Sequence, residues 1–163
     1  MANQITVGER LPNVRLRRLE DGRLEDYFLH DLTAGKKLLL VGFPGAYTPN
    51  CDGRHLPSFV ANADHIQTQG VDQIVGIAVN DPWVMQRWEA ETQAKGKVLL
   101  LSDGNADLTR QLGLLFDGQE LGMGQRCQRF FLIADNGIVR KINVDRGMAY
   151  ACTRSEDVLQ VLI

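Results

Sequence analysis

The chain has 163 residues, of which 44% are hydrophobic and 23% charged, and its formal net charge is −2. These values suit one soluble globular domain with a sizeable core, and we expect residues 1–163 to form a single domain. No basic block interleaved with aromatic residues suggests a nucleic-acid partner, and no apolar run is long enough to span a membrane. The N-terminal stretch lacks the apolar core of a signal peptide, so the expected location is the cytoplasm.

The chain before Lys37 is expected to be an irregular approach to the core. Short extended segments are predicted at 14–16 and 26–29, with a turn at 20–23 between them. The first buried strand is then predicted at Lys37–Phe43, because a short, almost unbroken apolar run followed by turn residues fits a strand covered on both faces.

The stretch after this strand combines a turn with a helix start. Pro44 and Gly45 end the strand, and Thr48-Pro49 is typical of a helix N-terminus, with Thr at the cap and Pro at the first helical position. Cys51 is therefore expected in the first helical turn. Free backbone N–H groups and the helix dipole favour the thiolate there, which is the nucleophilic form. The alternative is a small buried hydrophobe, but the surrounding pattern favours a reactive cysteine.

The helix that begins here is expected to run to about Gln69. Pro57 removes a backbone hydrogen bond and should kink it, and Gly53 weakens its first turn. These two residues are compatible with a first turn that opens or with a tolerated kink. The predicted buried face, at helical spacing, comprises Leu56, Phe59, Val60, Ala63 and Ile66.

Strands and helices alternate through the rest of the chain, with a Gly-rich connection expected at 116–124. The Asn136-Gly137 pair is a strong hairpin signal, and Asp81-Pro82 repeats the helix-start pattern. Thr153 and Glu156 fit a capping box for a last helix that begins at Thr153 or Ser155. Strands are predicted at 73–79, 98–101, 127–134 and 138–144, and helices at 82–95, 105–112 and the C-terminus. This order predicts an α/β protein with a mixed central sheet flanked by helices.

The three cysteines, Cys51, Cys127 and Cys152, do not make a disulfide framework. Their odd number in a chain expected to be cytoplasmic indicates reactive or buried thiols, and no CxxC motif is present. Cys51 and His55 have i,i+4 spacing, but two ligands are too few for a zinc site, so we predict no metal. A Cys-His hydrolase is a further alternative, yet His55 is more typical of a residue that packs or bonds near the helix start.

The residues around Cys51 resemble a known family. The pattern PxxxTxxC at 44–51 is similar to the peroxidatic motif of peroxiredoxins, and the longer string PGAYTPNCDGRHLPSFV at 44–60 resembles the type-five, or type II, subfamily. Two further blocks agree, AVNDPWVM at 78–85 and QRFF at 128–131 followed by DNG at 135–137. The resemblance covers nearly the whole chain, with the motifs in the expected order.

The resemblance implies a thioredoxin-like fold and a thiol-dependent peroxidase without a cofactor. It implies that Cys51 attacks hydrogen peroxide or an organic hydroperoxide and becomes a sulfenic acid. Arg129 would hold and polarise the peroxide, Thr48 would donate or accept through its hydroxyl, and Pro44 would shield the sulfur. Strand alternation predicts that Arg126 lies on the opposite face from Arg129.

The step that restores the thiol is left open by the sequence. Cys152 matches the resolving position of some animal members, and it is the one serious internal candidate. Cys127, two residues before Arg129, is predicted to share its strand face and is expected to be core. We expect an external thiol such as glutathione, glutaredoxin or thioredoxin to finish the cycle, because the tail after Val144 looks too short for easy reach.

Two further expectations concern partners. Type-five relatives commonly form homodimers, and the Tyr47 loop and the loop at 80–83 offer aromatic contact surface for such a pair. A peroxide sensor that passes oxidation to a partner protein through a mixed disulfide is the alternative function. A thioredoxin-like module with an inert cysteine is a third interpretation.

Overall fold

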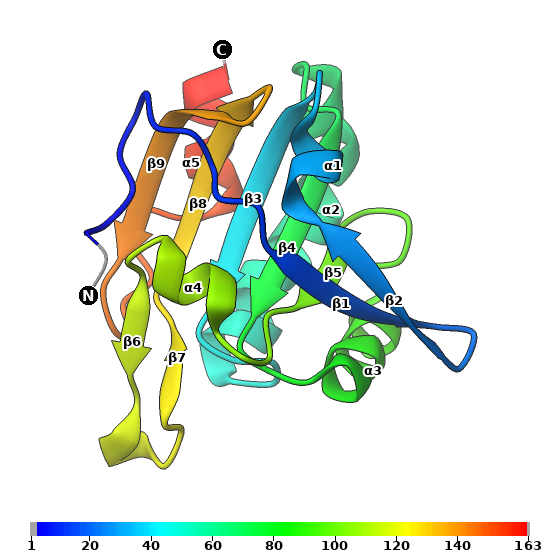
Figure 1. Cartoon of the computed structure of the whole chain (residues 1–163), viewed down its shortest axis with the longest axis vertical. Coiled ribbons are helices and arrows are strands. Elements are labelled where there is room, and N and C mark those ends of the chain that lie inside the picture. The colour runs from blue at the N-terminus through cyan, green and yellow to red at the C-terminus, as the bar shows by residue number, and fades with distance from the viewer. Residues whose placement is uncertain (1–2, 163) are drawn as a thin grey trace.

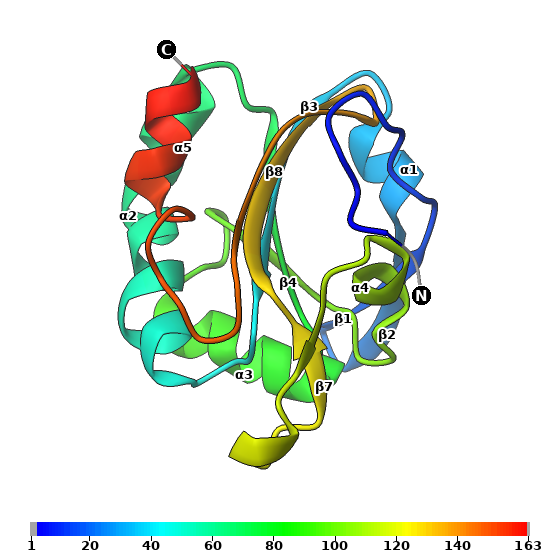
Figure 2. The same ribbon diagram turned by 90° about the vertical axis from the view of Figure 1, so that its left-hand side faces the viewer.

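A computed structural model of the chain describes residues 3–162. Its centre is a seven-stranded sheet in the order β2-β1-β5-β4-β3-β8-β9, with helices on both faces (Figures 1 and 2). This arrangement confirms the predicted α/β class with a mixed central sheet. The strands are β1 (Arg15–Glu20), β2 (Arg23–Phe28), β3 (Lys37–Phe43), β4 (Gln73–Ala78), β5 (Leu99–Ser102), β6 (Leu115–Asp117), β7 (Gln125–Cys127), β8 (Arg129–Asp135) and β9 (Ile138–Asp145). The helices are α1 (Leu29–Thr33), η1 (Cys51–His55), α2 (Leu56–Thr68), α3 (Pro82–Thr92), α4 (Asp107–Gln111), η2 (Gln119–Leu121) and α5 (Ser155–Leu162).

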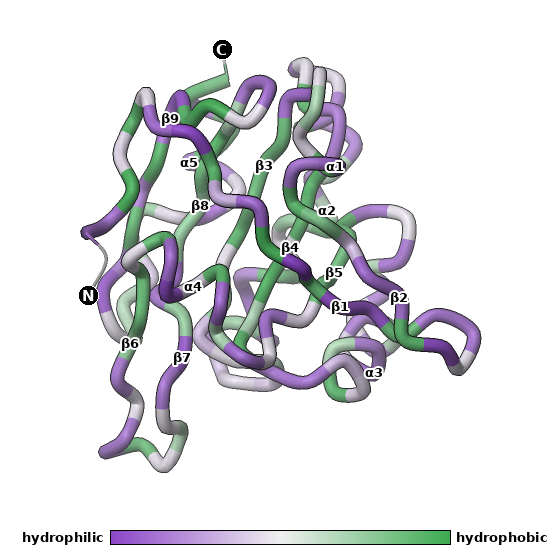
Figure 3. The backbone as a smooth tube through the Cα atoms, viewed as in Figure 1, coloured by the Kyte–Doolittle hydropathy of each residue, from purple (hydrophilic) through white to green (hydrophobic). Residues whose placement is uncertain are grey.

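The middle of the sheet is parallel and its flanks are antiparallel. Strand β3 runs parallel to β4, which runs parallel to β5, whereas β8 is antiparallel to both β3 and β9. Strand β3 has the bounds predicted from its apolar run and is almost wholly buried. Figure 3 shows the hydrophobic colour concentrated along β3, β4 and β8, as expected for strands covered on both faces.

The sheet separates two hydrophobic cores. Helices α2, α3 and α5 cover one face, and α1, α4 and the N-terminal segment cover the other (Figure 2). Alternation along β8 sends Phe131 and Ile133 into the first core and Phe130 and Leu132 into the second. Cys51 belongs to the first core, so the chemistry expected of it lies on the side of α2, α3 and α5.

The stretch predicted as a Gly-rich connection is instead a small hairpin. Strands β6 and β7 pair antiparallel around η2, and the hairpin projects from the end of the sheet (Figure 1). The strand predicted at 127–134 is consequently broken at Gln128, because β7 pairs with β6 and β8 begins a separate ladder at Arg129. Gln128 joins the two strands. Its backbone N–H donates to Leu114 O, and its side-chain amide donates to Leu115 O.

Helix ends follow the sequence signals in one case and depart from them in another. Asp81 caps α3 by accepting a hydrogen bond from the Val84 N–H at 2.9 Å. The predicted capping box at the last helix is wrong, because the Thr153 hydroxyl donates to Asp145 instead, and α5 begins at Ser155. Within residues 3–162, none of the helices has the length and apolar character needed to cross a membrane.

Candidate active site

Cys51 lies at the start of a helix that widens at once. Helical backbone begins at Pro49, as the sequence predicts, and the segment Cys51–His55 forms the π-helical turn η1. In this turn the Leu56 N–H donates to the Cys51 carbonyl, five residues back. Pro57 follows directly and has no N–H to donate, so the predicted irregularity takes the form of a wide turn at the cysteine. Cys51 itself is fully buried.

The loop before the helix is held by short polar contacts. The Thr48 hydroxyl donates to Gly45 O at 2.7 Å, and the backbone carbonyl of Thr48 accepts from the Asp52 N–H at 2.8 Å. The hydroxyl therefore stabilises the turn instead of capping the helix, while its oxygen retains the capacity to accept a further bond. Pro44 is buried beside this turn. The Ala46 N–H donates to the Asn80 side chain at 2.9 Å, which ties the loop to the end of β4.

Arg129 is a fully buried cation at the first position of β8. Its Nε donates to Ala149 O at 3.1 Å, and its Nη1 donates to His55 Nδ1 at 2.9 Å. The Tyr150 ring lies against the guanidinium, with 5.3 Å between Cζ and the ring centroid. Among the described residues, the buried Nη2 atom has no hydrogen-bond partner. An orphaned charged donor is costly in a dry site, so this nitrogen is suited to meet an oxygen-bearing ligand.

His55 connects the helix of Cys51 with Arg129. Its Nδ1 accepts from Arg129, and its Nε2 donates to Thr153 O at 2.9 Å, so the ring is neutral with its proton on Nε2. Burial, assisted by the charge of Arg129, lowers the pKa of His55 to about 3. His55 therefore packs and bonds near the helix start, as expected. Its lone acceptor faces the arginine, which leaves it unable to serve as the base of a hydrolase.

Aromatic side chains line the first core around this helix. The Phe43 ring meets both His55 and Trp88 edge to face, with centroid distances of 4.8 Å and 5.2 Å. Trp88 Nε1 donates to Asp52 Oδ1 at 2.9 Å, which fastens α3 to the wide turn. Cys51 is thus enclosed by packed apolar groups and a few directed polar contacts.

Cys127 lies in the other core, and the prediction that it shares a strand face with Arg129 is wrong. Its sulfur packs against Phe130 and over Gly42, in the cluster on the α1 and α4 side. Alternation does not extend from Arg129 back to Cys127, because the chain leaves the strand at Gln128. The expectation of a core cysteine holds, and burial raises the pKa of the Cys127 thiol well above its usual range. Because of the same break, Arg126 does not share a strand with Arg129, so alternation cannot relate their faces. Arg126 belongs to β7 and donates to Val79 O and Met123 O.

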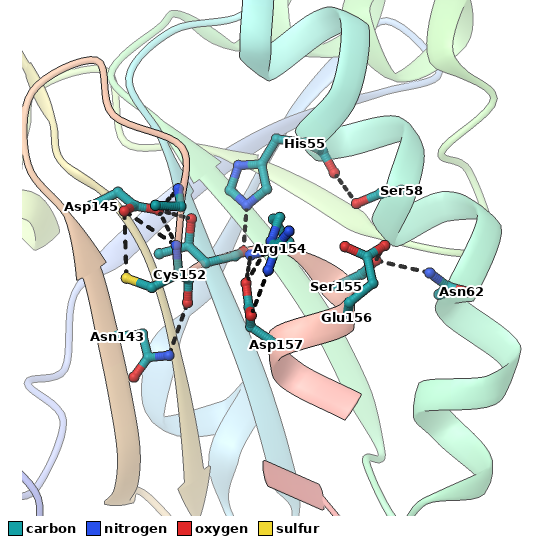
Figure 4. Close-up of polar contacts among 12 residues, drawn as sticks. His55, Ser58, Asn62, Asn143, Asp145, Cys152, Arg154, Ser155, Glu156 and Asp157 are labelled. Carbon is teal, nitrogen blue, oxygen red and sulfur yellow. Dashed lines mark hydrogen bonds and ion pairs between the residues drawn. The ribbon is translucent and has the colours of Figure 1, made fainter. Parts of the chain in front are cut away.

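Cys152 is half-buried beyond the end of β9. Its sulfur donates to Val144 O at 3.5 Å and to Asp145 Oδ1 at 3.4 Å. Burial and the hydrogen bond with Asp145 raise the pKa of Cys152 to about 11. Figure 4 shows the sulfur turned toward Asp145 and β9, on the side away from His55. In this conformation Cys152 is a protonated thiol directed away from the helix that carries Cys51.

The arrangement has the parts of a thiol chemistry site. At one end of the sheet it brings together a buried cysteine at a helix start, a half-buried threonine hydroxyl and a buried arginine whose Nη2 has no partner among residues 3–162. Across residues 3–162, no group of three or more potential metal ligands comes together.

Comparisons with known proteins identify the family of the chain. The family described as Redoxin matches residues 6–154. The chain is 40% identical to "Peroxiredoxin-2E-2, chloroplastic" of Oryza sativa subsp. japonica, across 97% of this chain and 72% of the relative. It is 37% identical to "Peroxiredoxin-2D" of Arabidopsis thaliana, across 97% and 98% of the two chains. The chain belongs to the peroxiredoxins.

A solved structure extends the comparison. The crystal structure of reduced Prx3 in complex with hydrogen peroxide from Vibrio vulnificus superimposes on this peroxiredoxin with a TM-score of 0.93 at 37% identity, over 98% of this chain and 100% of that one. These findings confirm the thioredoxin-like fold and the thiol-dependent peroxidase activity that the sequence motifs indicated. This peroxiredoxin is therefore a thiol-dependent peroxide reductase.

The sequence did not indicate the contacts that two residues, His55 and Asp145, make around Arg129. His55 was expected near the helix start, but its contact with Arg129 joins residues that are 74 positions apart. Asp145 was not singled out, although its carboxylate accepts bonds from Ala151, Cys152 and Thr153. Burial alone would raise the pKa of Asp145, yet those hydrogen bonds outweigh it and hold the pKa below its usual value. The one signal for Asp145 was its place directly after the strand predicted at 138–144.

Proposed function

We propose that Cys51 is the sulfur that attacks peroxide, with Arg129, Thr48 and Pro44 completing the site. The observation that supports this best is the unpartnered Nη2 of Arg129, which is fully buried beside the helical turn of Cys51. A guanidinium can donate to both oxygens of a hydroperoxide and remains charged as the O–O bond separates. The substrate class is hydrogen peroxide and organic hydroperoxides.

The proposed reaction transfers one oxygen to sulfur. The Cys51 thiolate attacks the terminal peroxide oxygen, an S–O bond forms, and the O–O bond breaks. The electron pair of the broken bond leaves with the second oxygen, which takes up a proton and departs as water or an alcohol. Arg129 Nη2 stabilises the developing charge, the Thr48 hydroxyl bonds a peroxide oxygen, and Pro44 keeps water from the sulfur.

The test is the mass of the intact protein after one equivalent of hydrogen peroxide. The mass of the wild type should rise by one oxygen, or fall by two hydrogens where the sulfenic acid has condensed with a second thiol of the chain and released water. Cys127→Ser should do the same, and Cys51→Ser should keep the mass of its reduced form. Rapid oxidation of Cys51→Ser would overturn the assignment of the attacking sulfur.

We further propose that an external thiol, such as glutathione, glutaredoxin or thioredoxin, completes the cycle. The sulfenic acid of Cys51 condenses with one thiol to a mixed disulfide and water, and a second thiol releases Cys51 by exchange. The orientation of the Cys152 sulfur supports this proposal, because a protonated thiol bonded to Asp145 must break that bond and move before it can reach Cys51.

Peptide mapping under non-reducing conditions separates the two routes. After mild peroxide treatment at low protein concentration without added thiol, we expect no dominant disulfide between Cys51 and Cys152. An abundant peptide carrying that disulfide would make this a two-cysteine enzyme and would contradict the external route.

A homodimer is proposed from the exposed aromatic surface next to the site. Tyr47 and Trp83 are 42% and 58% exposed, although both are large apolar side chains. Tyr47 also has a positive φ of 66°, a backbone conformation that is costly for a residue with a bulky side chain. Sedimentation at micromolar concentration should show a dimer, and Trp83→Arg should shift it to monomer. A wild type that sediments only as monomer would contradict the proposal.

Two expectations of the sequence stay predictions. The cytoplasm is the proposed location, and residues 1–163 are proposed to act as a single domain. Fractionation of cells that express the protein checks the first, and a single cooperative unfolding transition by calorimetry checks the second.

A further inference from the structure

An irregular segment between β9 and α5, residues 149–153, contacts both Arg129 and His55, which bond to each other beside the turn that carries Cys51. Arg129 Nε donates to Ala149 O at 3.1 Å, and His55 Nε2 donates to Thr153 O at 2.9 Å. The Tyr150 ring lies between these anchors, with 5.3 Å to the Arg129 Cζ and 5.3 Å between its centroid and that of His55. The position of the guanidinium therefore depends on the position of this segment.

The segment is held in turn by one buried carboxylate, that of Asp145. Its Oδ2 accepts from the Ala151 N–H at 3.0 Å, the Cys152 N–H at 3.0 Å and the Thr153 hydroxyl at 2.8 Å. Asn143 adds a bond to Cys152 O at 2.8 Å (Figure 4). Asp145 is only 5% exposed, so these bonds form with little competition from water.

Asp145 also occupies a particular place relative to Arg129. The two residues face each other directly in the antiparallel pairing of β8 with β9. The carboxylate nevertheless binds the 149–153 segment, and the guanidinium bonds to Ala149 and His55. A direct bidentate pair would occupy the nitrogens that a substrate needs. The observed arrangement leaves Nη2 without a partner among the described residues.

We propose that Asp145 is a positioning residue for peroxide reduction. By fixing residues 149–153, it places the carbonyl and the aromatic ring that seat Arg129, and it does so without neutralising the guanidinium directly. Thr153 carries the same constraint to His55, so one carboxylate orders both sides of the arginine. The inference rests on the proposed function of Arg129.

The first measurement is the rate of Cys51 oxidation by hydrogen peroxide in stopped flow. Asp145→Ala should slow it by about 10- to 100-fold, because a displacement of about 1 Å in a positioning group costs rates of this order. Asp145→Asn keeps an acceptor oxygen for the segment and should recover much of that loss. The matched control is Asp135→Ala. Asp135 lies at the far end of β8, and its carboxylate pairs with exposed Arg140, so the rate of this variant should match the wild type.

The decisive measurement is a double-mutant cycle with Arg129→Met. If Asp145 acts through the arginine, Asp145→Ala should change the rate by no more than about twofold in the Arg129→Met background. The same fold loss in both backgrounds would overturn the inference, because it would show an effect independent of Arg129. An unchanged rate in Asp145→Ala would overturn it as well.

Separate controls test whether each variant folds and whether the proposed function of Arg129 is correct. Each variant is first shown to be folded by its thermal midpoint, and if Asp145→Ala does not fold, Thr153→Val takes its place. That variant removes one donor to Asp145 and keeps the carbonyl that His55 uses. Thr153→Val should slow Cys51 oxidation by several-fold when it is the sole substitution. It should not slow oxidation further when it is added to Arg129→Met. Full speed in Arg129→Met itself would instead contradict the proposed function, which distinguishes the two failures.

Discussion

Two fully buried cysteines lie on opposite faces of one sheet in this peroxiredoxin, and their surroundings differ in kind. Cys51 sits at a helix start, in a wide turn whose His55 bonds to the buried guanidinium of Arg129. Cys127 packs against Phe130 in an apolar cluster, where burial raises the pKa of its thiol. Equal burial therefore predicts nothing about reactivity. What differs, among the described residues, is the buried cation Arg129, which lies on the Cys51 face and bonds to His55.

The largest expected effect comes from removing the cation on the Cys51 face. Arg129→Met should slow peroxide reduction by roughly 10²-fold or more, as is common when a donor to a developing charge is lost. Arg126→Met is the matched control, because Arg126 bonds backbone carbonyls of Val79 and Met123 and fastens the β6–β7 hairpin. Its effect should be far smaller. Equal losses in the two variants, measured by stopped flow, would remove the distinction between the faces.

A substitution on the Cys127 face should change stability without changing chemistry. Gly42 leaves no space there, since an added Cβ would lie 2.2 Å from the Phe130 ring and 3.0 Å from the Cys127 sulfur. Gly42→Ala should lower the free energy of unfolding by about 1–3 kcal/mol, the usual cost of overpacking. Urea unfolding checks the stability. The peroxide rate of the folded variant should match the wild type, and a large loss of rate would link the two faces.

A pH dependence should come from His55 on the Cys51 face. Its pKa of about 3 lies below the value of about 6.5 expected in the unfolded chain, so the unfolded state binds the proton first as pH falls. The contribution of His55 to stability is complete above pH 6.5 and declines toward pH 3. Between pH 7.5 and 5.5 it should fall by about 1.4 kcal/mol.

His55→Gln is the variant that isolates this effect. A glutamine amide can accept from Arg129 and donate to Thr153 O, as the neutral histidine does, but it does not titrate. Urea unfolding at the two pH values should therefore show a smaller decline for His55→Gln than for the wild type. An equal decline in both proteins would mean that His55 is not buried as a neutral ring.

The sequence predicted the face of the sheet that carries Cys51 better than the face that carries Cys127. The apolar run of β3, the Thr48-Pro49 helix start and the spacing to Cys51 are local signals, and each identified its element. The β6–β7 hairpin was missed because its Gly-rich stretch resembles a loop, and the break at Gln128 then misplaced Cys127. Alternation holds only within a continuous strand, and nothing local marks where that strand is interrupted.

The contacts that orient Arg129 could not be predicted for a different reason. His55 and Asp145 act through residues distant in sequence or through backbone carbonyls, which carry no residue-type signal. Thr153 looked like a helix cap because its spacing to Glu156 fits a capping box, but a buried carboxylate competes successfully for its hydroxyl. Tertiary hydrogen bonds overrode the local preference at that position.

The most direct test of the account is to trap the first sulfenic acid in the protein. The wild type is treated with less than one equivalent of hydrogen peroxide in the presence of dimedone, which labels sulfenic acids, and the labelled cysteine is located by mass spectrometry. We predict the label at Cys51, with Cys127 and Cys152 unlabelled. First labelling at Cys127 or Cys152 would contradict the claim that the buried cation and the helix start, and not burial of the sulfur, select the reactive cysteine.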